Sequence, residues 1–393
     1  MLADSVRDLA LRLDAADALP AYVYDLAALA AHAAAIRAAL PRPVEFYYAV
    51  KANPDARVLR TLAGHTDGLE VSSGGERAFA MTAVPGCRVA FGGPGKTSAE
   101  LARAVEAGTH RFHVESPHEL RMLASAASAA GRTADVLLRV NPASAGSGQS
   151  AALVMGGRPS PFGMDAALLD ACADELAWLD PGCLRLRGLH AHMASGLGAD
   201  DLLACARGLL GFGRDWCARR GVREPEFNLG GGMAVDYRRP DSVFDWARYG
   251  RGLAELACPG ETLRIEPGRA VTAYCGWYLS RVLDVKRNHG EEFAVIAGGT
   301  HHLRTPAAKG HDQPFAIIAV PSWSHDWTRP SAGPGLITIC GQLCTPRDIL
   351  ASRASVSRLC AGDLVAFGLA GAYAWNISHH SFLMHPGPTF HYL

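Results

Sequence analysis

The sequence lacks the charge imbalance and the cysteine spacing that mark several large classes of protein. Its 38 Lys and Arg residues are matched by 38 Asp and Glu residues, so nothing favours a nucleic acid or an anionic membrane as partner. The ten cysteines form no CxxC pair, which fits reduced thiols better than disulfides or a zinc site. We therefore expect a cytoplasmic protein that binds no nucleic acid.

Long apolar segments are also lacking. Residues 1–13 carry two Asp and two Arg, so they do not provide the apolar core of a signal peptide. The Ala-rich stretch 26–40 contains His32 and Arg37, and no uncharged apolar run reaches the length of a membrane span. We therefore expect a soluble protein that does not enter a membrane.

Eight short apolar runs alternate with Ala- and Leu-rich segments of helical composition. The runs are 44–50, 68–71, 88–91, 111–114, 135–140, 188–193, 226–229 and 263–265. This alternation predicts an α/β fold of the (β/α)8 barrel type, whose catalytic residues sit at the carboxyl ends of its strands. A doubly wound sheet is the main alternative, but it would require a nucleotide fingerprint after its first strand.

Nucleotide fingerprints are present only in incomplete form. Gly92–Thr97 resembles a Walker loop, but Ala90 stands where the motif needs its first glycine, so we interpret this segment as a barrel loop. Gly230–Gly232 does not extend to GxGxxG, because Val235 holds the last position.

The composition changes after residue 273. Strand-like runs follow one another with Gly, Pro and charged residues between them and little Ala-rich helix; they are 292–296, 315–320, 336–340 and 363–367. We predict a barrel over residues 27–273 and a mainly β domain formed by residues 1–26 and 274–393.

Lys51 is the leading catalytic candidate. The run 44–50 before it is dense in β-branched and aromatic residues, so a strand would deliver Lys51 to its carboxyl end. Partial desolvation there would leave an amine able to form a Schiff base with a carbonyl compound. An isolated lysine is more simply a surface side chain, so the interpretation depends on the other strand ends.

Those strand ends carry Glu70, Arg139, His192, Gly230–Gly232 and Glu266. Together with Lys51 they describe a site for a phosphorylated aromatic aldehyde. Glu266 could hydrogen-bond a protonated ring nitrogen, and His192 could stack on the ring. The glycines let backbone N–H groups approach a phosphate, and Arg269 can add charge there.

His190 and His192 also admit a metal-binding interpretation, because they alternate on one strand and point to one side. No carboxylate or third histidine lies at similar spacing nearby. We therefore predict no metal, with a metal-dependent hydrolase barrel as an alternative.

Five motifs in order resemble those of the fold-type III pyridoxal-phosphate decarboxylases, the group of diaminopimelate, ornithine and arginine decarboxylases. They are Tyr48–Asn53, His190–Gly196, Gly230–Gly232, Glu266–Arg269 and Gly371–Tyr373. The resemblance runs nearly end to end. It implies pyridoxal 5'-phosphate as cofactor, a barrel followed by a β domain, and an obligate homodimer with active sites shared between subunits.

The resemblance also implies roles for individual residues. Lys51 resembles the Schiff-base lysine, His192 the ring-stacking histidine, Glu266 the pyridinium partner and Arg139 an arginine beside the cofactor. Residues that match phosphate contacts are Ser195, Gly231, Gly232, Gly268, Arg269 and Tyr373. Cys344 resembles the cysteine that the other subunit supplies to help protonate the substrate carbon.

Departures from the family pattern concern the substrate. Thr345 follows Cys344 where diaminopimelate decarboxylases carry an acid, Ala194 replaces a glycine, and Pro161 replaces a lysine. The segment 298–306 and the Cys344 motif resemble instead the decarboxylases of carboxylate siderophore pathways, which act on citrate joined to a diamino acid. Cationic or donor groups for such a substrate are His301, His302, Arg304 and Arg347, beside Cys344 and Thr345.

Three further alternatives share the cofactor. They are a diaminopimelate or other basic amino-acid decarboxylase, an amino-acid racemase, and a non-catalytic regulatory homologue that binds pyridoxal phosphate. A racemase of this group would place an arginine at the ring nitrogen, which Glu266 argues against. A non-catalytic homologue should lack the second domain or the set of Lys51, Cys344 and the arginines.

Overall fold

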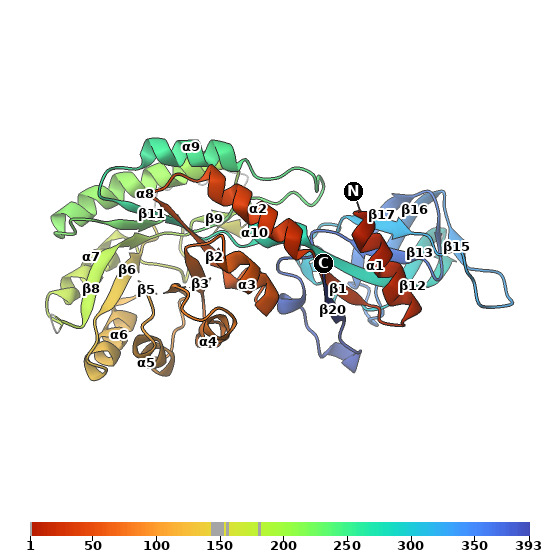
Figure 1. Cartoon of the computed structure of the whole chain (residues 1–393), viewed down its shortest axis with the longest axis horizontal. Coiled ribbons are helices and arrows are strands. Elements are labelled where there is room, and N and C mark those ends of the chain that lie inside the picture. The colour runs from red at the N-terminus through yellow and green to blue at the C-terminus, as the bar shows by residue number, and fades with distance from the viewer. Residues whose placement is uncertain (1, 143–152, 155–156, 180–181) are drawn as a thin grey trace. The chain divides into compact units, whose positions relative to one another are not determined.

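The computed structural model describes residues 2–142, 153–154, 157–179 and 182–393 (Figure 1). The chain divides into two compact units. We call residues 30–234 and 243–271 the barrel unit, and residues 1–29, 235–242 and 272–393 the β unit.

In the described part of the barrel unit, eight parallel strands close into a barrel. They are β2 (Val44–Ala49), β3 (Gly68–Val71), β4 (Val89–Phe91), β5 (Arg111–Val114), β6 (Ala134–Arg139), β8 (Leu184–His190), β10 (Glu226–Asn228) and β11 (Thr262–Ile265). The predicted barrel is confirmed. Strand β8 begins four residues before the expected run, because Arg185 and Arg187 alternate there with leucines and break the apolar pattern.

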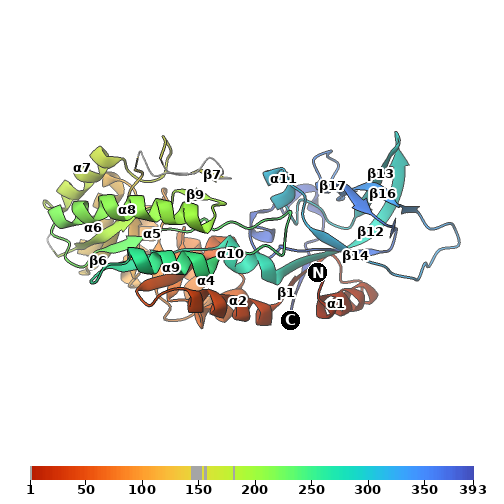
Figure 2. The same cartoon turned by 90° about the horizontal axis from the view of Figure 1, so that it is seen from above.

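Helix α2 (Leu26–Ala39) precedes the first barrel strand, and further helices follow barrel strands in the chain. They are α3 (Ala56–Ala63), α4 (Gly74–Ala83), α5 (Ser98–Glu106), α6 (Pro117–Ala129), α7 (Ala166–Leu176), α8 (Ala199–Arg219), α9 (Trp246–Leu256) and α10 (Arg269–Thr272). Helices α8 and α9 lie side by side in both views (Figure 1, Figure 2). None of the helices in the described ranges is long and apolar enough to cross a membrane.

Side-chain caps begin many of these helices sharply. In each case a short polar side chain accepts a backbone N–H of the first turn; the caps are Asp55, Ser73, Thr97, Ser116, Asp165 and Asp245. Thr97 and Glu100 form a complete capping box at α5. Sharp helix starts define where the strand-to-helix loops end, at the edge of the barrel where the candidate residues lie.

The β unit is built on one large sheet. Its central order is β14 (Phe315–Ile318), β19 (Leu364–Phe367), β12 (Gly276–Asn288), β13 (Glu291–Ile296), β16 (Gly335–Cys340) and β17 (Ile349–Val356). Strand β1 (Ala21–Tyr24) pairs antiparallel with β12 and parallel with β20 (Thr389–Tyr392). The short strands β15 (Ser331–Ala332) and β18 (Leu359–Cys360) form a separate pair. The predicted mainly β character is confirmed.

Helix α1 (Asp4–Ala15) closes a core against this sheet. Val6, Ala10 and Leu13 of α1 are buried in one cluster with Leu279 of β12 and Leu364 of β19. Strands β12 and β17 lay outside the predicted runs, because charged and polar residues interrupt their apolar residues. The N-terminal segment thus contributes both a helix and a strand to the β unit.

Candidate active site

Lys51 has an ion-pair partner at the end of the neighbouring strand. It lies in a 3-10 turn, Val50–Ala52, directly after β2. Its Nζ donates a hydrogen bond of 2.5 Å to Oε2 of Glu70, and Ser72 donates to the other oxygen at 3.0 Å. The Lys51 side chain is 42% exposed, whereas that of Glu70 is 5% exposed. The structure therefore pairs the amine of Lys51 with the buried carboxylate of Glu70, another of the expected strand-end residues.

His192 is held as an oriented, neutral ring. Its Nδ1 accepts the backbone N–H of Gly231 at 3.0 Å, so the ring proton sits on Nε2. Desolvation, together with the charges of Lys51 and Arg139, lowers the pKa of His192 to about 3. A neutral imidazole with a fixed plane is suited to stacking.

Gly230–Gly232 packs its backbone directly against two neighbouring segments. A Cβ on Gly231 would lie 2.3 Å from the carbonyl oxygen of Glu266. A Cβ on Gly232, whose φ is +100°, would lie 2.0 Å from the carbonyl oxygen of Ala194. Only glycine fits these positions, and the turn joins the residues that follow β8, β10 and β11.

Arg139 is buried at the end of β6 and paired with Glu115. Its Nη1 donates to Oε1 of Glu115 at 2.7 Å, and its guanidinium lies 5.0 Å from the centre of the Phe162 ring. The second oxygen of Glu115 accepts the N–H of Gly163 at 3.0 Å. The arginine is thus fixed by contacts from two loops, the one after β5 and the one that carries Phe162 and Gly163.

Lys96, the lysine of the Walker-like segment, is used inside the barrel unit. Its Nζ donates to Oε1 of Glu119 at 2.5 Å and to the carbonyl oxygens of Gly93 and His113 at 2.7 and 2.8 Å. An ammonium has three donors, and here all three have acceptors. The segment is a loop between β4 and α5, as we interpreted it.

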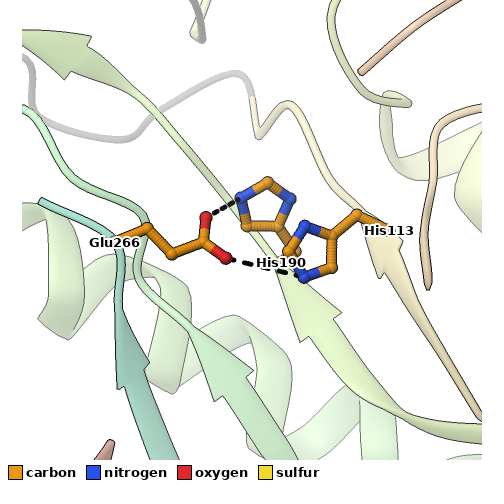
Figure 3. Close-up of side chains that lie close together, drawn as sticks. All are labelled: His113, His190 and Glu266. Carbon is orange, nitrogen blue, oxygen red and sulfur yellow. Dashed lines mark ion pairs between the residues drawn. The ribbon is translucent and has the colours of Figure 1, made fainter. Parts of the chain in front are cut away.

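Glu266 follows β11 and lies against two histidine rings, as Figure 3 shows. Its oxygens lie 3.8 Å from Nε2 of His113 and 3.6 Å from Nε2 of His190, and the two rings stack with centres 4.2 Å apart. Asn228 donates to Oε1 of Glu266 at 2.6 Å. Burial, aided by the charge of Glu70, raises the pKa of Glu266 to about 7. Burial lowers the pKa of both histidines well below its ordinary value, so both rings are neutral.

The same cluster corrects one expectation. His113, His190 and Glu266 offer ligand atoms that all lie within 4.8 Å of one another. We expected no third histidine or carboxylate near His190, but β5 and β11 are distant in sequence and bring both. His192 is not part of the cluster. The absence of a metal from the mechanism stays a prediction.

The remaining barrel residues of the predicted set lie beside these groups in the chain. Ser195 belongs to β9 (Ala194–Ser195), which pairs antiparallel with β7 (Leu153–Val154). A Cβ on Gly268 would lie 2.9 Å from Cβ of Ala52, so this glycine allows the backbone to approach the turn of Lys51. Arg269 begins α10.

In the β unit, Asp348 joins the two segments predicted to meet the substrate. Its Oδ1 accepts the backbone N–H and the hydroxyl of Thr300 at 2.6 and 2.7 Å, and its Oδ2 accepts the N–H of Leu343 at 2.8 Å. The loop that carries Cys344, Thr345 and Arg347 is thereby tied to the segment before His301. Cys344 and Arg347 are exposed on this loop.

His301 and His302 are buried and neutral. Tyr278 contacts Nδ1 of His302 at 3.0 Å, and the carbonyl oxygen of Pro386 contacts its Nε2 at 3.1 Å. Burial lowers the pKa of His302 to about 3 and that of His301 to about 4. Of the cationic or donor groups that we expected here, burial leaves these two histidines neutral and leaves exposed Arg304 as a cation near them.

Tyr373 adopts a left-handed backbone conformation, with φ of 49°, in the turn after Gly371. Its carbonyl oxygen accepts a hydrogen bond from the hydroxyl of Thr305, the first residue of α11 (Thr305–Lys309). The turn that carries Tyr373 is thus tied to the segment that carries Arg304.

Three neighbours of the site escaped the sequence analysis, namely Glu115, His113 and Asn228. A fourth, Glu70, was placed at the site but was given no role of its own. All lie at or within two residues of the carboxyl end of a barrel strand. A search for every polar residue in the last two strand positions would have found His113 and Asn228.

Comparison with known proteins indicates the same family as the sequence motifs, the pyridoxal-dependent decarboxylases. The model of a family described as "Pyridoxal-dependent decarboxylase, pyridoxal binding domain" matches residues 26–273. A 2-[(L-alanin-3-ylcarbamoyl)methyl]-2-hydroxybutanedioate decarboxylase of Staphylococcus aureus is 36% identical over 377 residues, or 95% of this chain and 93% of that one. A diaminopimelate decarboxylase of Bacteroides thetaiotaomicron is 30% identical over 365 residues, or 90% of each chain.

The fold has a close counterpart among solved structures. Diaminopimelate decarboxylase of Helicobacter pylori, complexed with L-lysine, gives a TM-score of 0.82 over 95% of this chain and 91% of that one. The sequences are 22% identical in this comparison, so the likeness shows the fold alone.

Proposed function

The chain belongs to the pyridoxal-dependent decarboxylase family, and from that premise we propose that it decarboxylates an amino-acid unit joined to citrate, in carboxylate siderophore biosynthesis. The protein is a carboxy-lyase that uses pyridoxal 5'-phosphate. The family membership argues against a metal-dependent hydrolase. The carboxylate of Glu266 argues against a racemase.

The donor set of the barrel unit fits this cofactor. Lys51 offers an amine for the aldehyde, His192 a neutral ring for the pyridine face, and Glu266 a carboxylate for the ring nitrogen. The N–H of Gly231 is already hydrogen-bonded to His192. We therefore expect the N–H of Gly232 to make the phosphate contact of this turn. Further phosphate contacts predicted from the family pattern are Ser195, Gly268, Arg269 and Tyr373, with Arg139 beside the cofactor.

The reaction breaks one carbon–carbon bond and adds one proton. The bond between the α-carbon and its carboxylate breaks, CO2 leaves, and a proton takes the place of CO2 on the α-carbon. Pyridoxal phosphate, when bound, supplies the electron sink that makes this bond cleavage accessible. The thiol of Cys344, exposed on its loop, is the proposed proton donor to the α-carbon, supplied by a second copy of the chain.

The proposed substrate follows from the charge of the Cys344 loop. A substrate with a distal ammonium needs an acid partner, and an unpaired cation in a closed site costs several kcal/mol. Thr345 offers no charge, and the nearby acid Asp348 already accepts three hydrogen bonds inside the β unit. This internal use of Asp348 is the observation that carries the proposal.

A citrate group instead brings carboxylates to exposed Arg304 and Arg347. Each charge-assisted hydrogen bond that forms would contribute roughly 1.5 to 3 kcal/mol. A citrate amide such as citryl-diaminopropionate combines these carboxylates with the amino-acid unit to be decarboxylated. The 36% identical relative carries such a compound in its name. Diaminopimelate remains the second candidate, because a 30% identical relative is a diaminopimelate decarboxylase.

A substrate panel tests the proposal. Purified protein is incubated with citryl-diaminopropionate, citryl-diaminobutyrate, diaminopimelate, lysine and ornithine, and products are identified by mass spectrometry. We expect loss of CO2 from a citryl conjugate, with Lys51→Ala as the inactive control. A preference for free diaminopimelate or ornithine over both citryl conjugates would overturn the substrate assignment and leave the general decarboxylase assignment intact.

A further inference from the structure

Asn228 is a fully buried amide at the end of β10 whose orientation is fixed by the backbone. Its Oδ1 accepts the N–H of Gly230 at 2.9 Å. Because the N–H of Gly230 must face an oxygen, this bond assigns the positions of the oxygen and the nitrogen in the Asn228 amide. The Nδ2 group therefore points away from the glycine turn and toward Glu266 and His113.

Both hydrogens of this amino group have acceptors. Nδ2 lies 2.6 Å from Oε1 of Glu266 and 3.2 Å from Nε2 of His113. Since His113 accepts at Nε2, its neutral ring carries the proton on Nδ1 and cannot donate to Glu266. His190 is 3.6 Å from the other oxygen, beyond a normal hydrogen bond. Among the described residues, Asn228 is the only side chain that donates a hydrogen bond to Glu266.

We propose that Asn228 is a positioning residue that holds Glu266 as an anion and leaves its Oε2 for the ring nitrogen of the cofactor, an inference that rests on the proposed function. The stacked His113 and His190 rings form a neutral wall beside the carboxylate. A donor is needed at such a site because burial favours the protonated acid, and a bond to the charged form opposes that effect.

An aspartate at this position would reverse the effect with little change in shape. It would still accept the N–H of Gly230, but it would face Glu266 with an oxygen in place of a donor. Two carboxylates at this distance share a proton, so Glu266 would lose its role as a full anion. Asn228→Asp therefore separates the electrostatic role of the amide from its structural bond to the glycine turn.

The test measures how strongly the protein recognises the ring nitrogen. Full-length apoprotein is titrated with pyridoxal 5'-phosphate and with 1-deazapyridoxal 5'-phosphate, in which a C–H group replaces that nitrogen. Wild type should prefer the natural cofactor. Asn228→Asp should reduce this preference by about tenfold to a hundredfold, the size expected for one hydrogen bond to a charged group, and should change binding of the deaza compound little.

Asn141→Asp is the matched control, because Asn141 also accepts a glycine N–H through Oδ1 and donates through Nδ2, but to the carbonyl oxygen of Arg158. It should leave the preference unchanged. If the absence of cooperative unfolding shows that Asn228→Asp does not fold properly, Asn228→Ala provides a second variant. It should also reduce the preference for the natural cofactor. Equal weakening of both compounds, or an unchanged preference, would overturn the proposal. If wild type bound neither compound, the proposed function itself would fall.

Discussion

The barrel unit fixes its candidate residues through contacts within itself, whereas the β unit leaves several of its own exposed. Lys51 is bonded to Glu70, Arg139 to Glu115, and His192 to the backbone of Gly231. In the β unit, Cys344, Arg304 and Arg347 are exposed, and Asp348 fixes the loop backbone rather than their side chains. A cofactor needs a preorganised site, while exposed groups can be completed by a substrate or a second subunit. Apart from Tyr373, which the family pattern predicts as a phosphate contact from the β unit, the comparison separates cofactor binding from substrate recognition.

Removing Lys51 should have the largest effect, because Lys51 belongs to the preorganised barrel unit and is the proposed attachment point of the cofactor. The chain contains four lysines, and in the barrel unit the other one, Lys96, already has three acceptors. Wild-type protein should absorb at ~420 nm, and borohydride should link the cofactor to Lys51. Lys51→Ala should abolish both this linkage and turnover. Mapping of the linked group to Lys96, Lys286 or Lys309 by peptide mass spectrometry would refute the assignment.

Mixing two inactive variants tests whether Cys344 of one subunit completes the active site of another. Lys51→Ala and Cys344→Ala should each be inactive alone. After subunit exchange, half of the dimers are mixed and each mixed dimer holds one intact site, so about a quarter of wild-type activity should return. Exchange is verified with two affinity tags. No recovery in a verified mixture would mean that Cys344 does not act across subunits.

Truncating the exposed arginines should have an intermediate effect. Arg347→Ala and Arg304→Ala should each lower kcat/KM for the citryl substrate about tenfold to a hundredfold, because each removes a charge-assisted bond. The cofactor absorbance should not change, since the barrel unit is untouched. Arg287→Ala, an exposed arginine on β12, is the control and should retain full activity. An effect of either arginine on cofactor absorbance would contradict the separation of roles.

The last prediction concerns the stability of the apoprotein rather than its activity. Burial raises the pKa of Glu266 to about 7. Between pH 5 and 8, folding therefore shifts this carboxyl from its ionised form toward its protonated form, which costs free energy. The folded state binds more protons than the unfolded state in that range, and stability contributed by this group falls as pH rises. Glu266→Gln, which resembles the protonated acid, should be nearly neutral at pH 5 and stabilising by up to roughly 3 kcal/mol at pH 8.

Urea unfolding of both proteins at several pH values measures this difference. A gap between Glu266→Gln and wild type that does not grow from pH 5 to pH 8 would show that the acid is already ionised without cost.

Local patterns accounted for the barrel, but not for groups that meet through long-range packing. All eight barrel strands were apolar runs, and Lys51 stood at the end of one of them. The burial of His302 depends instead on Tyr278 and on the carbonyl of Pro386, 84 residues away in sequence. Likewise, Asn228 meets Glu266 only because β10 and β11 are neighbours in the barrel. No spacing rule within one segment reveals such pairs.

The pairing of β1 has a consequence for the order in which the chain folds during synthesis. Residues 21–24 leave the ribosome early, but their partners are residues 276–279 and 389–392. The eight barrel strands lie between them in sequence, so the barrel can close while β1 still has unpaired edges. We expect β1 to stay accessible to proteases in ribosome-bound chains until the final strand emerges. A strand synthesised before the whole barrel is thus among the last to reach its native pairing.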